Sequence, residues 1–346
     1  MVRRNRTRKP GKPWPPRFRC YHTTTKGLTD ISGIRVGHAS DYDALTGCTV
    51  ILCESGAVGG VDIRGAATGT EEIDVLRPAH IADRVHAIVL AGGSAFGLEA
   101  ASGVRRYLEH RGVGFPTGPA VVPIVPCAIL FDLAIGKPNV RPTREMGEAA
   151  AAGATTDAVK QGAVGAGTGA TVGKIFGMPQ AMKSGIGSFT VSLSETVRVA
   201  ALVAVNALGD VRDPETGRLI AGARRAPDSM KLAGTEGAMK RGSSGGFGRQ
   251  NTTLAVVATN GRLSKVGANR LAEMANLGME RTIFPVHTAF DGDLCFALSL
   301  GNETADLNAL GVAAAEAVAG AILQAVKSAP TLGGVPGLAG PPVKPL

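Results

Sequence analysis

The amino-acid sequence predicts a fold of mixed α and β structure. Two apolar runs of strand length, AIVLA at 87–91 and LAVVAT at 254–259, have the composition of strands that are buried on both faces. Residues 265–277 have the apolar spacing of an amphipathic helix, and residues 307–327 form an alanine-rich run with an apolar face. Because strands and helices interleave along the chain, periodicity alone indicates only this mixed class.

The remaining elements follow from local composition. After a short extended segment at 28–41, further strands are expected at 46–53, 186–193 and 197–205, and further helices at 96–110 and 143–158. Pro123 and Pro126 interrupt the apolar run at 120–133, which therefore predicts an irregular or edge segment. Residues 234–250 contain six glycines and three basic residues without an apolar period, which predicts a flexible loop.

The net charge of +9 is concentrated at the start of the chain. Residues 1–26 carry nine of the 37 basic residues and no acid, so 28 basic residues face 28 acidic ones in the remainder. We expect residues 1–26 to form a disordered basic tail and residues 329–346 a Pro/Gly tail. Aromatic residues make up only 4 %, so no base-stacking surface and no specific nucleic-acid partner are expected.

The five cysteines form an odd set without CxxC spacing, which predicts reduced thiols rather than a disulfide framework. Further ligands are not evident near Cys48 and Cys53, so no metal site is expected. No apolar run approaches the roughly 18 residues of a membrane span without a polar interruption. These features predict a cytoplasmic protein without a membrane span.

Two glycine-rich stretches resemble known motifs but do not match them at key positions. A nucleophile elbow around Ser94 would need glycine at position 96, where Phe96 stands, so the glycines at 92–93 more simply let a helix pack close to a strand. In GAVGAGTGATVGK at 162–174, Thr168 occupies a position where a phosphate-binding loop needs glycine, and Ile175 follows the lysine. A nucleotide site is therefore not expected.

A hydroxyl lies where the predicted loop becomes a rigid strand. If Thr252 Oγ attacked the carbonyl carbon of Asn251, the peptide bond would shift to an ester, and hydrolysis would leave Thr252 as a new N-terminus. The free amine could then act as general base for its own side chain. An Asn-Thr pair is also an ordinary way to begin a strand, so this pattern alone does not decide between a nucleophile and a structural residue.

Five blocks of sequence together resemble the DmpA-type family of self-processing aminopeptidases and amide hydrolases, which are related to β-aminopeptidases and nylon-oligomer hydrolases. They are LTDISGIRVGH at 28–38, LAGGSAFGLEAASGV at 90–104, GAGTGATVGK at 165–174, GRQNTTLAVVATNG at 248–261 and PVHTAFDGDLCFAL at 285–298. The resemblance runs in family order from about residue 28 to 327. It implies an α+β fold, a four-layer αββα sandwich resembling N-terminal-nucleophile hydrolases.

The resemblance also implies one hydrolase domain at 27–328 that cleaves itself between Asn251 and Thr252. Both fragments would stay together because Thr252 begins a central strand, and the cleaved pairs would form a homotetramer. The expected substrate is a small peptide or amide, and no cofactor is needed. Thr252 would be the nucleophile, with its α-amine as base.

Supporting roles are expected for residues on neighbouring strands and loops. A carboxamide at a strand end can donate to an oxyanion, and the resemblance places that role on Asn206. It also makes Lys174 a site cation. Asp291 and Asp293, two carboxylates at i and i+2 on an extended chain, are expected as the pair that orients Thr252. A plain DGD turn or a metal turn is the alternative for this pair, although few oxygen donors for calcium lie nearby.

The resemblance also implies a pocket that includes Gly93, Ser94 and Phe131. Some family members have a tyrosine where this chain has Phe131, and phenylalanine cannot donate a hydrogen bond. His287 is expected to be structural. Two other functions remain open at this stage: acyl transfer of the ornithine acetyltransferase type, and a non-catalytic scaffold that uses the basic tail to contact nucleic acid.

Overall fold

The computed structural model describes residues 26–243 and 251–341, so most of the expected basic tail and part of the loop before Thr252 lie outside the described residues. Within this part of the chain, nine strands are joined by hydrogen bonds around β2 (Thr46–Ile63). The first half of β2 pairs with β1 (Arg35–Asp41) and β4 (Val85–Ala91), and its last residues pair with β16 (Leu294–Glu303). One long strand therefore belongs to two sheets.

The two sheets lie face to face. Beyond β4, the first sheet continues through β7 (Cys127–Ile129) to β3 (Gly69–Glu71). Beyond β16, the second sheet continues through β14 (Thr252–Gly261) and β11 (Arg198–Asn206) to β10 (Ile186–Ser192). Apolar side chains from both sheets, among them Ile88, Leu254 and Phe296, form one buried cluster between them.

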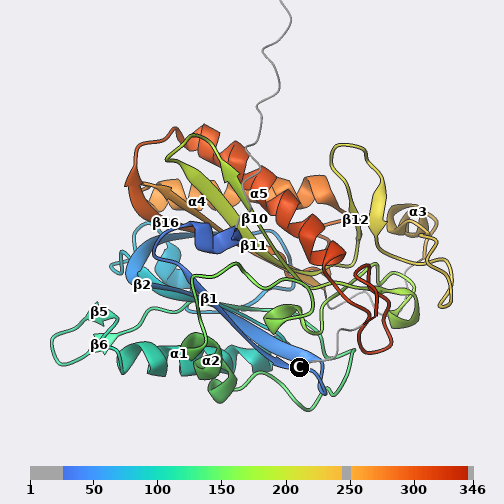
Figure 1. Ribbon diagram of the computed structural model, residues 1–346, viewed down its shortest axis with the longest axis horizontal. Helices are drawn as coiled ribbons and strands as arrows, with labels where there is room; N and C mark the ends of the chain where they lie inside the picture. The colour runs from blue at the N-terminus through green and yellow to red at the C-terminus, as the bar shows by residue number, and fades with distance from the viewer. Residues whose placement is uncertain (1–25, 244–250, 342–346) are drawn as a thin grey trace, which may run out of the picture.

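Helices cover the two outer faces. The second sheet packs its other face, including Val203 and Val257, against α4 (Lys265–Thr282) and α5 (Leu307–Lys327). The first sheet packs against α1 (Ala100–Glu109) and α2 (Arg144–Ala152). Figure 1 shows these two helix pairs on opposite sides of the sheets. The expected four-layer αββα sandwich is thus confirmed, and three apolar interfaces hold its layers together.

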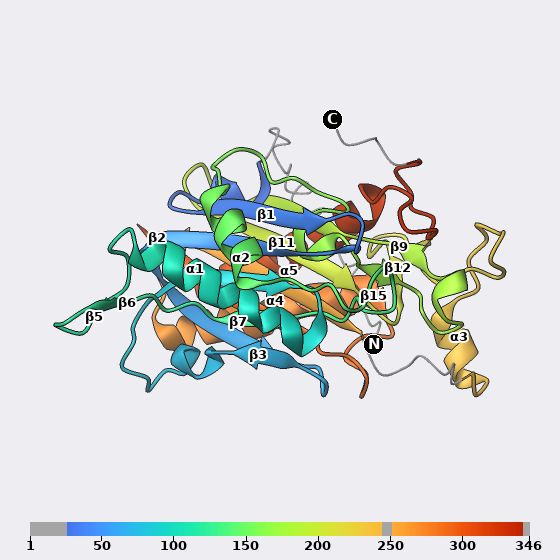
Figure 2. The same cartoon turned by 90° about the horizontal axis from the view of Figure 1, so that it is seen from below.

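Strand β14 lies inside the second sheet, antiparallel to β11 and parallel to β16. Its apolar and β-branched residues are buried on both faces, as its composition predicts. Figure 2 shows the same fold from below, with α1 and α2 in front of the sheets. The first residue of β14 pairs with β11, and pairing with β16 begins two residues later at Leu254, so the start of the strand is held in place.

The smaller elements complete the chain. Their bounds are β5 (Phe115–Pro116), β6 (Val121–Val122), β8 (Thr171–Val172), β9 (Met182–Lys183), β12 (Asp210–Arg212), β13 (Leu219–Ala221), β15 (Ile283–Phe284) and α3 (Thr235–Lys240). Helix α3 corrects the prediction of a flexible loop over 234–250 for residues 235–240, whereas residues 244–250 lie outside the described residues. Its first residue, Thr235, donates from its N–H and hydroxyl groups to the buried carboxylate of Asp210, which anchors the helix.

Two helices have different bounds from those predicted. The helix predicted at 96–110 begins with a 3-10 turn, Ser94–Glu99, before α1. The helix predicted at 143–158 ends at Ala152; Thr143 caps its start by accepting a bond from the Met146 N–H, and Gly153 follows its last residue. In the second helix, the glycine after Ala152 outweighs the apolar spacing that extended the prediction to residue 158.

The C-terminal part of the chain packs on the domain. Helix α5 is the one described helix whose length and composition would allow a membrane crossing, but 67 % of its apolar window is buried inside the protein. Packing against β10, β11 and α4 accounts for that composition. The segment after α5, expected as a tail, buries Ala329 and Val335 as far as residue 341 is described.

Candidate active site

The ends of two neighbouring strands bring Asn206 and Thr252 together. Asn206 is the last residue of β11, Thr252 is the first residue of β14, and the two are paired across the sheet. Both side chains are buried. The Thr252 hydroxyl donates a hydrogen bond of 2.6 Å to the carbonyl oxygen of Asn251. The predicted nucleophile therefore already lies against the peptide group that it would attack.

The segment at 290–293 holds the chain on both sides of the Asn251–Thr252 bond. Asn251 forms a parallel bridge with Asp291 and donates from its N–H to the carbonyl of Phe290 at 3.3 Å. The Gly292 N–H donates to the Asn251 carbonyl oxygen at 2.8 Å. On the other side of the bond, the Thr253 N–H donates to Asp293 Oδ1 at 2.6 Å.

Both expected carboxylates are buried beside this bond. Asp291 accepts a bond of 2.8 Å from the Thr288 N–H. Its burial, followed by the charge of Asp293, raises the pKa of Asp291 to about 6, whereas Thr288 and Lys174 oppose the rise. The carboxyl of Asp291 therefore changes its charge in a mildly acidic range.

His287 contacts the second carboxylate. Its Nδ1 lies 3.0 Å from Asp293 Oδ2, and its backbone N–H donates to the same oxygen at 3.0 Å. A backbone φ of 56° at His287 lets both groups reach Asp293. The prediction that His287 is structural missed this contact, because a spacing of six residues along an irregular loop does not indicate proximity.

Lys174 lies against Asn206. Its ammonium donates to Asn206 Oδ1 at 2.7 Å and to the Asn206 backbone oxygen at 3.0 Å. The Thr171 N–H donates to the same Oδ1, and Asn206 Nδ2 donates to the Phe131 carbonyl at 2.8 Å. Two donors on one side and an acceptor on the other set the orientation of the carboxamide. Burial lowers the pKa of Lys174 to about 7, and the carboxylates of Asp291, Asp293 and Asp132 oppose this change.

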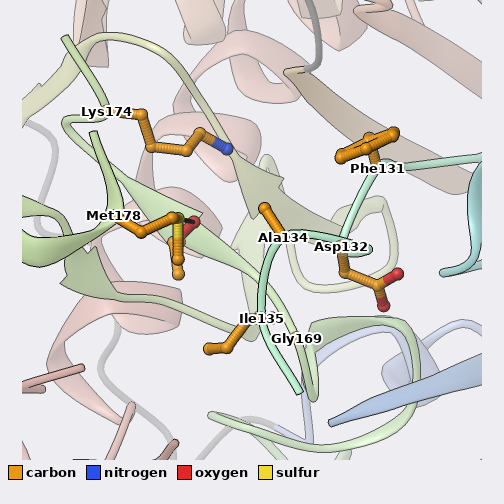
Figure 3. A pocket seen from close by; sticks show the side chains of 8 residues that line it. Phe131, Asp132, Ala134, Ile135, Gly169, Lys174 and Met178 are labelled. Atoms are coloured by element: carbon orange, nitrogen blue, oxygen red, sulfur yellow. Dashed lines mark hydrogen bonds between the residues drawn. The ribbon is translucent and has the colours of Figure 1, made fainter. Parts of the chain in front are cut away.

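A small pocket opens beside these residues. Figure 3 shows Lys174 and Met178 on one side of it and Phe131 and Asp132 on the other. Its walls are mainly apolar, and the Lys174 ammonium is the basic group among the lining residues. Phe131 thus reaches the site in two ways: its ring lines the pocket and its carbonyl holds Asn206.

Comparison with known proteins decides the family. The sequence profile described as peptidase family S58 matches residues 26–339, a span that includes β11, β14 and the 287–293 segment. The chain belongs to peptidase family S58. It is therefore a hydrolase of peptide or amide bonds, and the resemblance to the DmpA-type family is confirmed.

Curated relatives of this S58 peptidase carry hydrolase names. It is similar to an uncharacterised aminopeptidase of Mycobacterium tuberculosis, with 41 % identity over 89 % of this chain and 96 % of the relative. It is also similar to a 6-aminohexanoate-oligomer endohydrolase of a Kocuria species, with 32 % identity over 86 % of this chain and 85 % of the relative.

Solved structures support the fold of the S58 peptidase. It resembles the L-aminopeptidase D-Ala-esterase/amidase of Ochrobactrum anthropi, described as a variant of the Ntn hydrolase fold, with a TM-score of 0.69 and 18 % identity over 90 % of this chain and 88 % of the other. A β-aminopeptidase from a Burkholderia species gives a TM-score of 0.65 and 22 % identity, with 90 % of each chain covered.

Five of the predicted site residues of this S58 peptidase come together: Thr252, Asn206, Lys174, Asp291 and Asp293. Gly93 and Ser94 do not line the pocket described above. They contact residues next to the pocket instead. The Gly93 N–H donates to Oδ1 of the pocket residue Asp132 at 2.7 Å, and the Ser94 N–H donates to the Leu130 carbonyl.

Sequence reasoning missed two buried charged residues of the S58 peptidase. Asp132 accepts from Gly93 and from the Thr46 hydroxyl, and burial raises the pKa of its carboxyl to about 6. The fully buried Lys183 ammonium donates to three backbone carbonyls, those of Gly167, Ala170 and Ser184. Asp132 directly follows Phe131 in the sequence, which was a usable signal. Nothing around Lys183 in the sequence indicates its burial.

Proposed function

We propose that this S58 peptidase cleaves its own chain between Asn251 and Thr252 and then uses Thr252 as an N-terminal nucleophile. The observation that carries the proposal is the 2.6 Å contact between Thr252 Oγ and the Asn251 carbonyl at the start of a strand paired on both sides. A strand that cannot shift keeps the hydroxyl close to one particular peptide group, which favours the intramolecular reaction.

In the self-cleavage, Thr252 Oγ forms a bond to the Asn251 carbonyl carbon, and the carbonyl π pair moves to the oxygen. The bond between that carbon and the Thr252 nitrogen then breaks, and the nitrogen takes up the proton that the hydroxyl loses. This leaves an ester between Asn251 and Thr252 Oγ together with a free α-amine. Water hydrolyses the ester and releases the mature N-terminus.

In the mature enzyme the same hydroxyl attacks the substrate carbonyl, and the new α-amine accepts its proton. Asn206 helps to hold the oxyanion, because Lys174 and Thr171 fix its carboxamide. Lys174, Asp291 and Asp293 balance the charge around the amine. An α-amine has a reference pKa of roughly 8, so we expect activity to rise from neutral to mildly alkaline pH.

The substrate we propose is a small peptide or amide that loses its N-terminal residue. Relatives named aminopeptidase and 6-aminohexanoate-oligomer endohydrolase support an amide bond in a short linear molecule. The pocket walls formed by Phe131, Ile135 and Met178 are apolar, which suits a small aliphatic group. Assembly into a homotetramer of cleaved pairs stays a prediction.

The deciding test is denaturing intact-mass analysis of the wild type beside Thr252→Ala and Thr252→Ser. We expect two chains, 1–251 and 252–346, from the wild type and from Thr252→Ser, and one chain from Thr252→Ala. Folding of the alanine variant is checked by circular dichroism. A wild type that stays whole while folded, or an alanine variant that is still cut at this bond, would overturn the proposal.

Processed enzyme is then assayed with aminoacyl p-nitroanilides and with the linear dimer of 6-aminohexanoate, with and without an added amine acceptor. Hydrolysis predicts free acid as the product in both conditions. Transfer of the acyl group to the added amine as the main product would instead indicate an acyltransferase.

A further inference from the structure

We propose that the backbone N–H of Gly292 stabilises the oxyanion formed during self-cleavage, an inference that rests on the proposed function. The Gly292 N–H donates a bond of 2.8 Å to the carbonyl oxygen of Asn251. When Thr252 Oγ bonds to the Asn251 carbon, this oxygen receives the π pair and becomes negatively charged. An oxyanion hole needs a donor about 2.7–3.1 Å from the charged oxygen, and the Gly292 N–H is already within that range of the carbonyl oxygen before the attack begins.

The Gly292 bond differs from the other contact to the same oxygen. The Thr252 hydroxyl also donates to the Asn251 carbonyl, at 2.6 Å. That hydroxyl must turn toward the carbonyl carbon and lose its proton in order to attack, so its own bond to the oxygen is lost. The amide of Gly292 takes no part in bond making and can keep its contact throughout the step.

The amide is held rigidly by a second segment of the chain. The carbonyl of Asp291 accepts from the Ala67 N–H at 2.9 Å, and the carbonyl of Asp293 accepts from the N–H groups of Arg64 and Gly65 at 3.0 and 2.9 Å. The first bond fixes the peptide group that contains the Gly292 N–H, and the other two fix the peptide group that follows Asp293. Preorganised donors stabilise developing charge without any cost of reorganisation during the reaction.

Glycine is required at this position for a steric reason. A Cβ at residue 292 would lie 2.8 Å from Thr252 Oγ and 2.8 Å from the Ala67 carbonyl oxygen. Any side chain would therefore press on the nucleophile. The lack of a side chain lets the amide and the attacking hydroxyl lie on the same carbonyl oxygen.

An ordinary β-bridge could also account for the Gly292 bond, because Asn251 and Asp291 are bridge partners. The two explanations predict different results when the N–H alone is removed. Loss of a structural bond lowers stability, whereas loss of an oxyanion donor lowers the rate of the chemical step in a folded chain. Replacing the residue 292 amide by an ester makes this distinction.

The experiment uses in vitro translation of the full chain with glycolic acid at position 292, which replaces the N–H by an ester oxygen and adds no atoms. The matched control places lactic acid at position 67, which removes the bond to the Asp291 carbonyl but keeps the Gly292 N–H. A second control places glycolic acid at position 162, whose N–H bonds to Ile186 in another isolated bridge. Cleavage is followed by gel and mass spectrometry, and folding by limited proteolysis.

We expect the ester at 292 to slow self-cleavage about 100-fold, while both controls stay within a few-fold of the wild type. A second measurement avoids the ester: in full-length Thr252→Ala with ¹³C at the Asn251 carbonyl, the infrared stretch should lie at the lowered frequency of a hydrogen-bonded amide.

The inference is overturned if the chain with the ester at position 292 cleaves itself after Asn251 at the wild-type rate, or if the control at position 67 slows self-cleavage equally. It is also overturned if the Asn251 carbonyl stretch lies at the frequency of a free amide. In those cases the wild type still cleaves, so the proposed function stands. If the wild type never cleaves itself, both the proposed function and the inference about Gly292 are wrong.

Discussion

The Lys174 ammonium donates to both oxygens of Asn206, at 2.7 Å to Oδ1 and at 3.0 Å to the backbone carbonyl. These two hydrogen bonds join the glycine-rich segment before Lys174 to the end of β11, where Asn206 is paired with Thr252. Because Oδ1 accepts from the ammonium, Nδ2 is the donating end of the carboxamide; one of its two N–H groups bonds to the Phe131 carbonyl, which leaves the other for an oxyanion. We therefore expect Lys174 to act on the proposed reaction through the orientation of Asn206.

The first prediction concerns the coupling of these two residues. In the processed enzyme, Lys174→Met and Asn206→Ala should each lower kcat/KM for an aminoacyl p-nitroanilide about 100-fold, and the double variant should be about as slow as the slower single variant. The reason is that residues acting as one unit show non-additive effects. The measurement is kcat/KM for this substrate with the processed form of the four proteins of the cycle. If the double variant is slowed by the product of the two single effects, the residues act independently and the coupling is contradicted.

The second prediction concerns His287. We expect its contact with Asp293 to raise the rate of self-cleavage about tenfold, so the His287→Ala variant should cleave itself about tenfold more slowly than the wild type. His287→Asn should restore most of the rate, because asparagine tolerates a positive φ and can place Nδ2 where the histidine has Nδ1. The exposed His110→Ala serves as the matched control. A fully active alanine variant would show that the contact has no positioning role.

The third prediction concerns pH and stability. The pKa of the Asp132 carboxyl is raised from 3.8 to about 6, so the folded state binds its proton more tightly than the unfolded state does. The stability from this residue is fully present below pH 3.8 and is lost as pH rises through 6. A rise of this size corresponds to ~3 kcal/mol.

Denaturant unfolding at pH 4 to 8, in uncleaved Thr252→Ala, checks this prediction. Adding Asp132→Asn should flatten the pH dependence between 4 and 6 relative to the parent, since asparagine does not titrate. Asparagine can still accept from the Gly93 N–H and donate to the Thr46 hydroxyl oxygen, so the variant should fold. Identical pH profiles for parent and variant would mean that the carboxyl does not titrate in this range.

The fourth prediction concerns the turn that supports the 291–293 segment. A Cβ at residue 65 would lie 2.3 Å from the Asp291 carbonyl oxygen and 2.3 Å from the Asp293 nitrogen, and backbone cannot give way easily. Gly65→Ala should therefore displace this segment, nearly abolish self-cleavage and lower stability by about 1–3 kcal/mol. Gly267→Ala, whose Cβ would meet only ordinary contacts, is the control. Normal cleavage of Gly65→Ala would show that the segment adapts.

Local sequence was enough to predict the central strands and the long helices. The run at 254–259 and the helix at 307–327 correspond to β14 and α5 because apolar composition reports burial directly. The position of Thr252 at a change from glycine-rich loop to buried strand was likewise visible in the sequence. The family resemblance supplied the four-layer architecture and the peptidase activity, and both are confirmed.

Only the tertiary structure decided which distant groups meet. The length of β2, which belongs to both sheets, depends on partners on either side of it. The contacts of His287 with Asp293 and of Gly292 with Asn251, and the burial of Lys183, likewise depend on how separate segments pack. Periodicity records whether a residue faces the core, but a hydrogen bond depends on direction and distance between two groups. Those are set only when the layers have packed together.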